Sequence, residues 1–146
     1  MEQRGTHLAY LGLGSNLGDG PAQLRDAIRR LGATGEVVAE SDFVESEPWG
    51  FGSAHRFTNA VVALRTGLTP LGLLDATQQI ERDMGRRHKH CPGEPYTDRL
   101  IDIDLLTYDD LRLQSDRLTL PHPLIEERDF VRLPLAQCRA KVNRYF

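Results

Sequence analysis

The order of apolar segments along the chain is the feature that most limits what it can fold into. Four segments are rich in apolar and β-branched residues, which is typical of strands, and two others show helical periodicity. The strand-like segments cover residues 7–13, 37–44, 57–64 and 100–108. With the helices between them, the order is β-α-β-β-α-β, which predicts a ferredoxin-like α+β sandwich with an antiparallel sheet and its helices on one face.

Capping residues mark where both helices begin. Asp19 or Gly20 can cap the first helix with Pro21 in its first turn, and Thr69 precedes Pro70 at the second. The second helix carries a stripe at helical spacing, formed by Leu71, Leu74, Thr77, Gln78 and Glu81. After the fourth strand we expect a turn at 109–110, a short strand near 118–120 and a short helix that follows residue 123.

Size and composition limit the class of protein. At 146 residues the chain is long enough for one core, so we expect a single domain over 1–146. The net charge of −3 gives no reason to expect a nucleic-acid partner, and no apolar run approaches the length of a membrane span. Two cysteines do not form a disulfide framework, and no signal peptide is visible, so the cytoplasm is the expected compartment.

Two carboxylates in an otherwise apolar strand are the strongest chemical signal. Asp102 and Asp104 stand at i and i+2, so both point to the same face of a strand. Two carboxylates this close repel each other, and each loses hydration when it is partly buried. A cation bound between them offsets both costs. Mg²⁺ suits carboxylates that share it with water and phosphate. Arg99 and the basic stretch 86–89 precede the pair, so the pattern indicates a nucleotide–metal site, although an acidic solvent face remains the simpler alternative.

Six motifs occur in the order found in one family. They are YLGLGSNLG at 10–18, FTNAVVAL at 57–64, QQIERDMGR at 78–86, DRLIDIDLL at 98–106, LTLPHP at 118–123 and RDF at 128–130. With these motifs the chain resembles the 6-hydroxymethyl-7,8-dihydropterin pyrophosphokinases of folate synthesis. The resemblance implies transfer of a pyrophosphoryl group from ATP to the pterin hydroxymethyl, release of AMP and a requirement for two Mg²⁺ ions. We expect a monomer whose partners are ATP and the pterin.

The resemblance also implies roles for individual residues. The catalytic residues would be Arg86, Arg99, Asp102 and Asp104, of which the two aspartates would hold the metal. The ATP-binding residues would be Gln78, Arg86, Lys89, Arg99, Leu105, Thr119, His122 and Arg128. The pterin-binding residues would be Ser46, Trp49, Phe57, Asn59, Tyr96 and Phe130. From the residues alone, Phe57 and Phe130 could equally be core, and a histidine such as His122 is more often structural.

Two other motifs are weak. The segment 12–18 matches neither the Rossmann spacing nor a Walker loop, since Leu17 stands where a glycine is needed and no lysine follows. We therefore interpret it as a strand end and a tight turn. His88, His90 and Cys91 lack a second pair at zinc-like spacing. Asp98 replaces a proline of the family pattern and adds a negative charge beside the acidic pair.

Two rival functions stay open on these residues. A non-catalytic ferredoxin-like binding domain would keep the sheet and would not need the acidic pair. A pterin aldolase would act on a related substrate without ATP or Mg²⁺. For the pyrophosphokinase we expect ATP to bind before the pterin, with closure of two glycine-bearing loops at 45–55 and 84–98. No residue stands out as general base, although Asp102 is a candidate.

Overall fold

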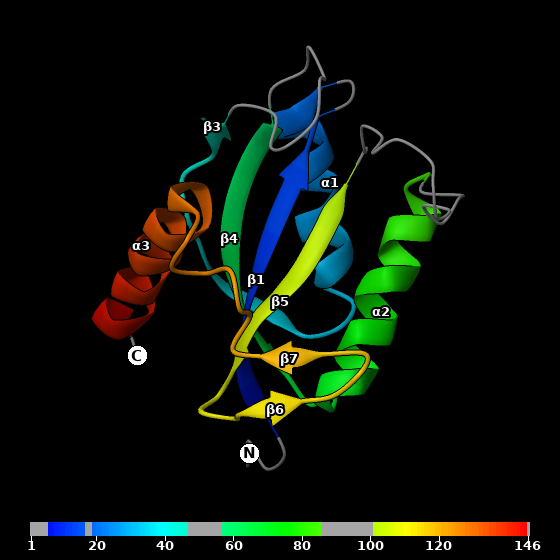
Figure 1. Ribbon diagram of the computed structural model, residues 1–146. Helices are drawn as coiled ribbons and strands as arrows, with labels where there is room; N and C mark the ends of the chain where they lie inside the picture. The colour runs from blue at the N-terminus through cyan, green and yellow to red at the C-terminus, as the bar shows by residue number, and fades with distance from the viewer. Residues whose placement is uncertain (1–5, 17–18, 47–56, 86–100, 146) are drawn as a thin grey trace.

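A computed structural model describes residues 6–16, 19–46, 57–85 and 101–145 of the chain. Figure 1 shows one twisted sheet with helices on both of its faces. The sheet strands are β1 (His7–Ser15), β2 (Glu36–Glu40), β3 (Val44–Ser46), β4 (Phe57–Thr66) and β5 (Asp102–Tyr108). The described helices are α1 (Gly20–Leu31), α2 (Pro70–Asp83) and α3 (Asp129–Tyr145). None of these helices is both long and apolar enough to traverse a bilayer.

The sheet has the strand order β2-β4-β1-β5, with β3 also paired to β4 and every pair antiparallel. The first strand therefore lies in the middle, between the two strands that carry FTNAVVAL and DIDLLTY. β5 is an edge strand, and a small hairpin of β6 (Leu113–Gln114) and β7 (Thr119–Leu120) lies near it (Figure 1). This topology confirms the predicted ferredoxin-like α+β fold.

The helix starts follow the predicted caps. The Asp19 side chain accepts a hydrogen bond from the Ala22 amide at 3.1 Å, and the Thr69 hydroxyl accepts one from the Gly72 amide at 3.0 Å. Each bond satisfies an amide that the first turn of a helix leaves without an intrahelical partner. Of the two N-cap residues predicted for α1, Asp19 is therefore the one that caps the helix.

Two apolar cores lie on opposite faces of the sheet. Leu24, Leu31 and Leu73 of α1 and α2 pack on one face, together with Ile103 and Leu105 of β5. On the other face, α3 packs through Leu135, Cys138 and Val142 against Tyr10, Val61, Ala63 and Leu106. Because successive residues of a strand face opposite sides, the acids of β5 point to the face that carries α3.

Four details differ from the sequence-based prediction. The expected strand over 37–44 is two strands, because residues 41–43 interrupt the ladder. The expected short helix after residue 123 is a series of turns, and a 17-residue helix, α3, follows it. This helix covers the second face of the sheet, so helices are not confined to one face. In α2 the buried side chains are Leu73, Thr77, Ile80 and Glu81, whereas Leu71 and Gln78 are exposed.

Candidate active site

A row of residues across three neighbouring strands forms the base of the candidate site. Gly14 of β1 is in register with Asn59 of β4 on one side and with Asp102 of β5 on the other. Gly12 is likewise in register with Asp104. Directly paired residues share a face, so the amide of Asn59 and both carboxylates project from the same face of the sheet, two strand spacings apart, or about 10 Å.

The two glycines contribute no side chain to the middle of this row, and side chains of the neighbouring strands lie close to both of them. A methyl group at Gly14 would lie 3.2 Å from Oδ1 of Asn59 and 3.6 Å from a ring carbon of Phe57. At Gly12 it would lie 3.5 Å from the side chain of Leu106, an ordinary contact distance. The GLG motif, interpreted above as a strand end and turn, is therefore mid-sheet in part. Because both positions are glycines, the side chains of Leu106, Asn59 and Phe57 can lie close to β1 between the predicted pterin-binding and metal-binding residues.

Glu81 of α2 holds the strand between the two acids. Its carboxylate accepts a hydrogen bond from the backbone amide of Ile103 at 2.8 Å, and only 6% of the residue is exposed. Among the described residues β5 is an edge strand, so no described strand bonds this amide on its outer side. Glu81 supplies that partner from the helix and fixes the backbone midway between Asp102 and Asp104.

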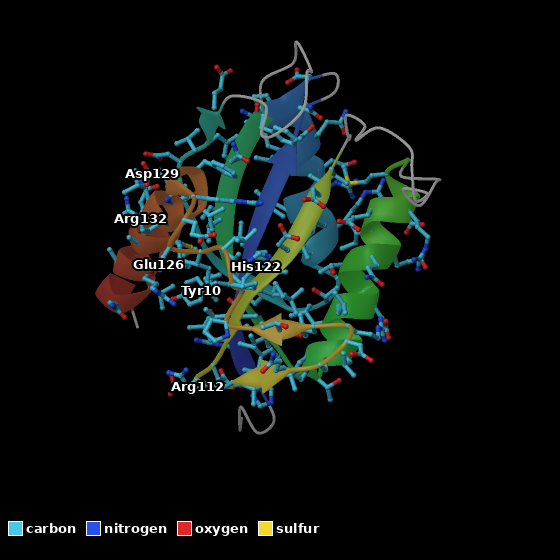
Figure 2. The ribbon with its side chains drawn as sticks, viewed as in Figure 1. Tyr10, Arg112, His122, Glu126, Asp129 and Arg132 are labelled. Carbon is cyan, nitrogen blue, oxygen red and sulfur yellow. The ribbon has the colours of Figure 1, made fainter. Side chains whose placement is uncertain are left out.

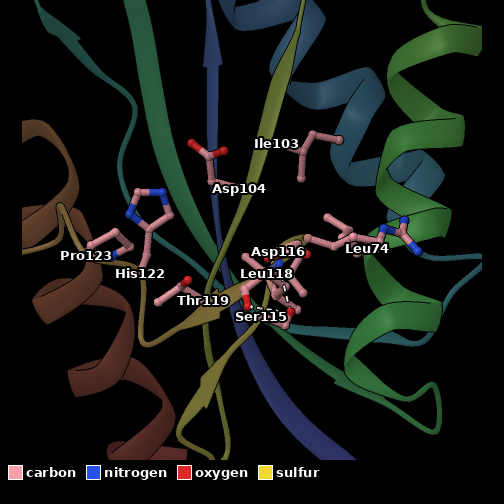
Figure 3. Close-up of a pocket in the computed structure, with 11 residues that line it drawn as sticks. Leu74, Ile103, Asp104, Ser115, Asp116, Leu118, Thr119, His122 and Pro123 are labelled. Carbon is pink, nitrogen blue, oxygen red and sulfur yellow. Dashed lines mark hydrogen bonds between the residues drawn. The ribbon is translucent and has the colours of Figure 1, made fainter.

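A pocket of about 280 Å³ opens beside the outer edge of β5. Its lining combines four of the predicted site residues, namely Asp104, Leu105, Thr119 and His122, with Leu74, Ile103, Pro123 and residues 115–118. Figure 3 shows Asp104 and His122 on the α3 side of β5 and Ile103 on the side of α2. The pocket therefore runs along the strand edge and reaches one of the two carboxylates.

His122 is held by two backbone contacts. Along β5 the pairing with β1 skips Leu106, because Leu11 faces Leu105 and Tyr10 faces Thr107. The carbonyl of Leu106 accepts the His122 amide at 2.8 Å, so the bulge in β5 anchors the connection that carries the histidine. Figure 2 shows His122 between β5 and α3.

The protonation state of His122 follows from its second contact. Nδ1 accepts a hydrogen bond from the Leu124 amide at 3.1 Å, so the proton of the neutral ring is on Nε2. Burial lowers the pKa of His122 below its ordinary value, and the Arg128 charge acts in the same direction while Asp102 opposes it. At neutral pH this side chain is therefore a neutral donor through Nε2.

Arg128 and Phe130 lie at the start of α3. The Arg128 guanidinium carbon is 5.7 Å from the centre of the Phe130 ring, which is within the range of a cation–π contact. Arg128 and Asp102 both act electrostatically on His122. These three residues come from β5, the connection after β7 and the start of α3, and the fold brings them to one region.

The structure leaves several predicted site residues untested. Gln78 is on the exposed face of α2 and does not line the pocket. The backbone of Ser46 pairs with Phe57 at the end of β3. The remaining predicted residues, Trp49, Arg86, Lys89, Tyr96 and Arg99, lie outside the described residues, as do both predicted mobile loops apart from 45–46 and 84–85.

Sequence reasoning missed the role of Glu81 and of residues 115–118. In the sequence, Glu81 belongs to the helical stripe of α2. A glutamate at a position otherwise taken by apolar residues indicates a buried carboxylate that needs a hydrogen-bond partner, and this was the available signal. Residues 115–117 precede the LTLPHP motif and have no pattern of their own, whereas Leu118 is its first residue. Residues 115–118 line the pocket because the β6–β7 hairpin folds back beside β5, and only the tertiary structure could reveal that.

The acids fit Mg²⁺ better than a metal that needs a complete protein cage. Within the described ranges, no group of three or more His, Cys, Asp or Glu side chains is placed to hold an ion. Mg²⁺ is commonly bound by one or two carboxylates together with waters and substrate phosphates. Asp102 and Asp104 are half-buried and so partly accessible, which suits that kind of shared binding.

The fold and this face of the sheet define a ferredoxin-like α+β domain in which an acidic pair lies between a pocket and two glycines of the central strand. Comparisons with known proteins narrow the class. Residues 10–140 match the model of the family described as 7,8-dihydro-6-hydroxymethylpterin-pyrophosphokinase (HPPK). The 2-amino-4-hydroxy-6-hydroxymethyldihydropteridine pyrophosphokinase of Porphyromonas gingivalis is 50% identical over 131 residues, which is 88% of each chain. That of Bacillus subtilis is 36% identical over 94% of this chain and 81% of its own.

Solved structures agree on the fold. The HPPK-DHPS protein of Plasmodium falciparum matches with a TM-score of 0.69 at 15% identity, over 96% of this chain. This chain spans 44% of that one, so the likeness concerns only part of the larger protein and shows the fold alone. The chain thus belongs to the 7,8-dihydro-6-hydroxymethylpterin-pyrophosphokinase family, and its function is pyrophosphoryl transfer to the hydroxymethyldihydropterin in folate biosynthesis.

Proposed function

We propose that the pyrophosphoryl donor is ATP, that AMP is released, and that Asp102 and Asp104 bind two Mg²⁺ ions between the two substrates. One observation carries this proposal: Asp104 lines the pocket at the edge of β5, whereas Asp102 shares a row with Asn59. The acidic pair therefore lies between a space for a nucleotide and the residues assigned to the pterin.

The pocket supports nucleotide binding along the strand edge. In an antiparallel strand, alternate residues turn their backbone groups to the same edge, so Leu105 presents its amide to the outer side, as Ile103 does. Such groups, with the apolar side chains of Leu74 and Leu118, suit a flat base that needs both stacking contacts and hydrogen bonds. Thr119 adds a hydroxyl to the same lining.

Phosphate binding is assigned to the residues around the acids. His122 can donate from Nε2 to a phosphate oxygen, and the guanidinium of Arg128 adds a permanent positive charge. When bound, Mg²⁺ would neutralise phosphate charge and make the transferred phosphorus more electrophilic. Arg86, Lys89, Arg99 and Gln78 remain assigned to ATP on the resemblance alone.

The pterin side rests on Asn59, Phe57 and Phe130. An amide can both donate to and accept from the amide-like edge of a pterin, and aromatic rings can stack on its plane. Asn59 is 5% exposed in an otherwise apolar strand, and its Nδ2 lies 3.5 Å from the carbonyl of Val44. Ser46, Trp49 and Tyr96 keep the pterin role that the resemblance gives them. Asp102 stays a candidate general base for the attacking hydroxymethyl.

We further propose that the chain works as a monomer, as a single domain over 1–146, and in the cytoplasm. The support is that both faces of the sheet are covered by the chain's own helices. Sedimentation equilibrium of the purified protein should give the mass of one chain.

The first test is product analysis. The purified protein is mixed with 6-hydroxymethyl-7,8-dihydropterin, ATP and Mg²⁺, and the products are followed by ³¹P NMR. We expect pterin-dependent AMP, abolished by a chelator and lowered on the order of 100-fold or more by Asp104→Asn, since electrostatic stabilisation of the phosphates would be lost. Asp110→Asn is the matched control, because Asp110 is an exposed acid just beyond β5 that does not line the pocket.

Other products would give different answers. ADP would show transfer of a single phosphoryl group and would overturn the proposed chemistry. Conversion of a pterin without ATP or Mg²⁺ would favour the aldolase, and binding without any turnover would favour the non-catalytic domain.

A further inference from the structure

The break between β2 and β3 is a β-bulge that α3 holds in place. From Glu40 to Val44 the chain advances four residues, whereas their partners on β4, Val62 and Asn59, are three residues apart. One residue is therefore extra on the outer strand. A bulge of this kind bends the strand and changes the direction of the segment that follows.

Ser41 marks where the ladder is rebuilt around the extra residue. Its amide donates to the carbonyl of Val61 at 2.8 Å, and its hydroxyl accepts the Val61 amide at 2.9 Å. The hydroxyl thus replaces a backbone carbonyl in the ladder. Asp42, the next residue, is left with a backbone amide that the sheet does not satisfy.

Gln137 of α3 satisfies that amide. Its Oε1 accepts the hydrogen bond from the Asp42 amide at 2.7 Å, and its Nε2 donates to the Asp42 carboxylate at 2.8 Å. One helical turn further on, Nζ of Lys141 donates to the carbonyl of Glu40 at 2.7 Å. Both sides of the bulge are therefore attached to the C-terminal half of α3, a segment without a motif of its own.

The bulge sets the register of the strand beside the assigned pterin residues. β3 begins two residues after Asp42, and it pairs Val44 with Asn59 and Ser46 with Phe57. Nδ2 of Asn59 also donates to the carbonyl of Val44 at 3.5 Å. A shift of the bulge would move this carbonyl and so change how the Asn59 amide is oriented.

We propose that Gln137 is a positioning residue for the pterin side of the site, acting through Asp42 and β3. The proposal rests on the assignment of Asn59 to the pterin. It predicts that the contact between Gln137 and Asp42 controls the affinity for the pterin and leaves the affinity for the nucleotide unchanged, because the pocket at β5 is on the other side of β1.

The test measures KM for each substrate in a set of variants. Gln137→Ala should raise the KM for the pterin roughly three- to tenfold, the range expected for the loss of one or two hydrogen bonds. The KM for ATP should stay within about twofold. Gln79→Ala is the matched control, because Gln79 is an exposed glutamine on α2 that donates to Asp83 and accepts from Arg82, both in its own helix.

A rescue pair separates positioning from general stability. Gln137→Glu alone would place a carboxylate against the carboxylate of Asp42, and the pterin KM should rise as it does in Gln137→Ala. Combined with Asp42→Asn, the glutamate can accept from both the backbone amide and the new side-chain amide. Both hydrogen bonds are then restored, and the pterin KM should return to within about twofold of the original value.

The outcomes also distinguish the positioning role of Gln137 from the assignment of Asn59 to the pterin, on which it rests. If Asn59→Ala raises the pterin KM and the Gln137 variants do not, the positioning role is wrong. If Asn59→Ala leaves the pterin KM unchanged, the pterin side has been assigned wrongly and both proposals fail. An equal rise in both KM values for Gln137→Ala, without rescue in the double variant, would also overturn the positioning role.

Discussion

At the scale of single residues, Glu81 shows how a side chain outside the acidic pair can control it. The Ile103 amide lies between Asp102 and Asp104, and Glu81 is the group that bonds it. An edge strand has few such restraints, because one of its sides has no neighbouring strand. The placement of the two acids should therefore depend on this one hydrogen bond.

We predict that Glu81→Ala raises the Mg²⁺ concentration needed for half-maximal activity and lowers kcat, while Glu81→Gln largely retains both. The glutamine can still accept the amide, whereas alanine leaves the amide without that partner at a cost of about 1–3 kcal/mol. Titration of activity with Mg²⁺ at saturating substrates measures the effect.

Tyr108→Phe is the matched control for Glu81→Ala. The Tyr108 hydroxyl donates to the carbonyl of Leu68 at 2.6 Å, so it ties the far end of β5 to the segment before α2. This variant should lower the free energy of unfolding without changing the Mg²⁺ dependence. If Glu81→Ala and Tyr108→Phe changed the Mg²⁺ dependence equally, Glu81 would only stabilise the fold and would not position the acids.

At the scale of elements, the connection from β7 to α3 links the pocket to the second core. Its backbone is attached to the bulge of β5 at Leu106, and it then turns through Leu124 into α3. The connection carries His122 and leads directly to Arg128. Its conformation depends on the neutral form of His122, because Nδ1 must accept the Leu124 amide.

We predict that acid weakens the fold through His122. Its pKa in the folded protein is below the ordinary value of 6.5, so between these two values the unfolded chain binds more protons. The contribution is complete above about pH 6.5 and decreases as the pH falls toward the folded-state pKa. Urea unfolding of the protein and of His122→Asn, from pH 7.5 down to 5, measures it, since asparagine can accept the Leu124 amide but does not titrate.

The difference in stability between the protein and His122→Asn should shrink or reverse toward low pH. A difference that stays constant over this range would show that His122 titrates at the same pH in the folded and unfolded states.

At the scale of the whole molecule, the sheet carries a separate core on each face, and the site lies where the α3 core ends. Val61, Ala63 and Leu106 lie under α3, whereas Asn59 and Asp104, two residues further along the same strands, flank the glycines of β1 on the same face. The same strands therefore supply both the packing and the site, and bound ligands should stabilise the whole fold.

We predict that a non-hydrolysable ATP analogue with Mg²⁺ raises the free energy of unfolding, by about 2.7 kcal/mol at a hundredfold excess over its Kd. The gain should be much smaller with a chelator or in Asp104→Asn, because the metal would no longer bridge protein and phosphate. Thermal unfolding followed by circular dichroism measures this gain. Equal stabilisation with and without Mg²⁺ would contradict a metal-bridged nucleotide.

Several parts of the fold and site could be predicted from local sequence. Capping by Asp19 and Thr69 and the strand pattern at 57–64 depend on neighbouring residues, so they gave helix starts and strands that the structure confirms. The polar run Glu40-Ser41-Asp42 was the available signal for the break between β2 and β3, and it was missed. The attachment of this break to Gln137 could not be predicted, because Gln137 is 95 residues from Asp42 in the chain. Gly14 was interpreted as a turn residue, since its partners Asn59 and Asp102 are distant in the chain.

The sequence by itself determined the identities and periodicities of the residues. These were enough for the element order, for two acids on one strand face and for the ordered motifs of a pyrophosphokinase. Tertiary structure alone decided which distant residues share a register: Asn59, Gly14 and Asp102 in one row, Glu81 on the Ile103 amide, and α3 on the bulge. The physical reason is that local conformation depends on neighbours within a few residues, whereas these contacts depend on how the strands pair and the helices pack.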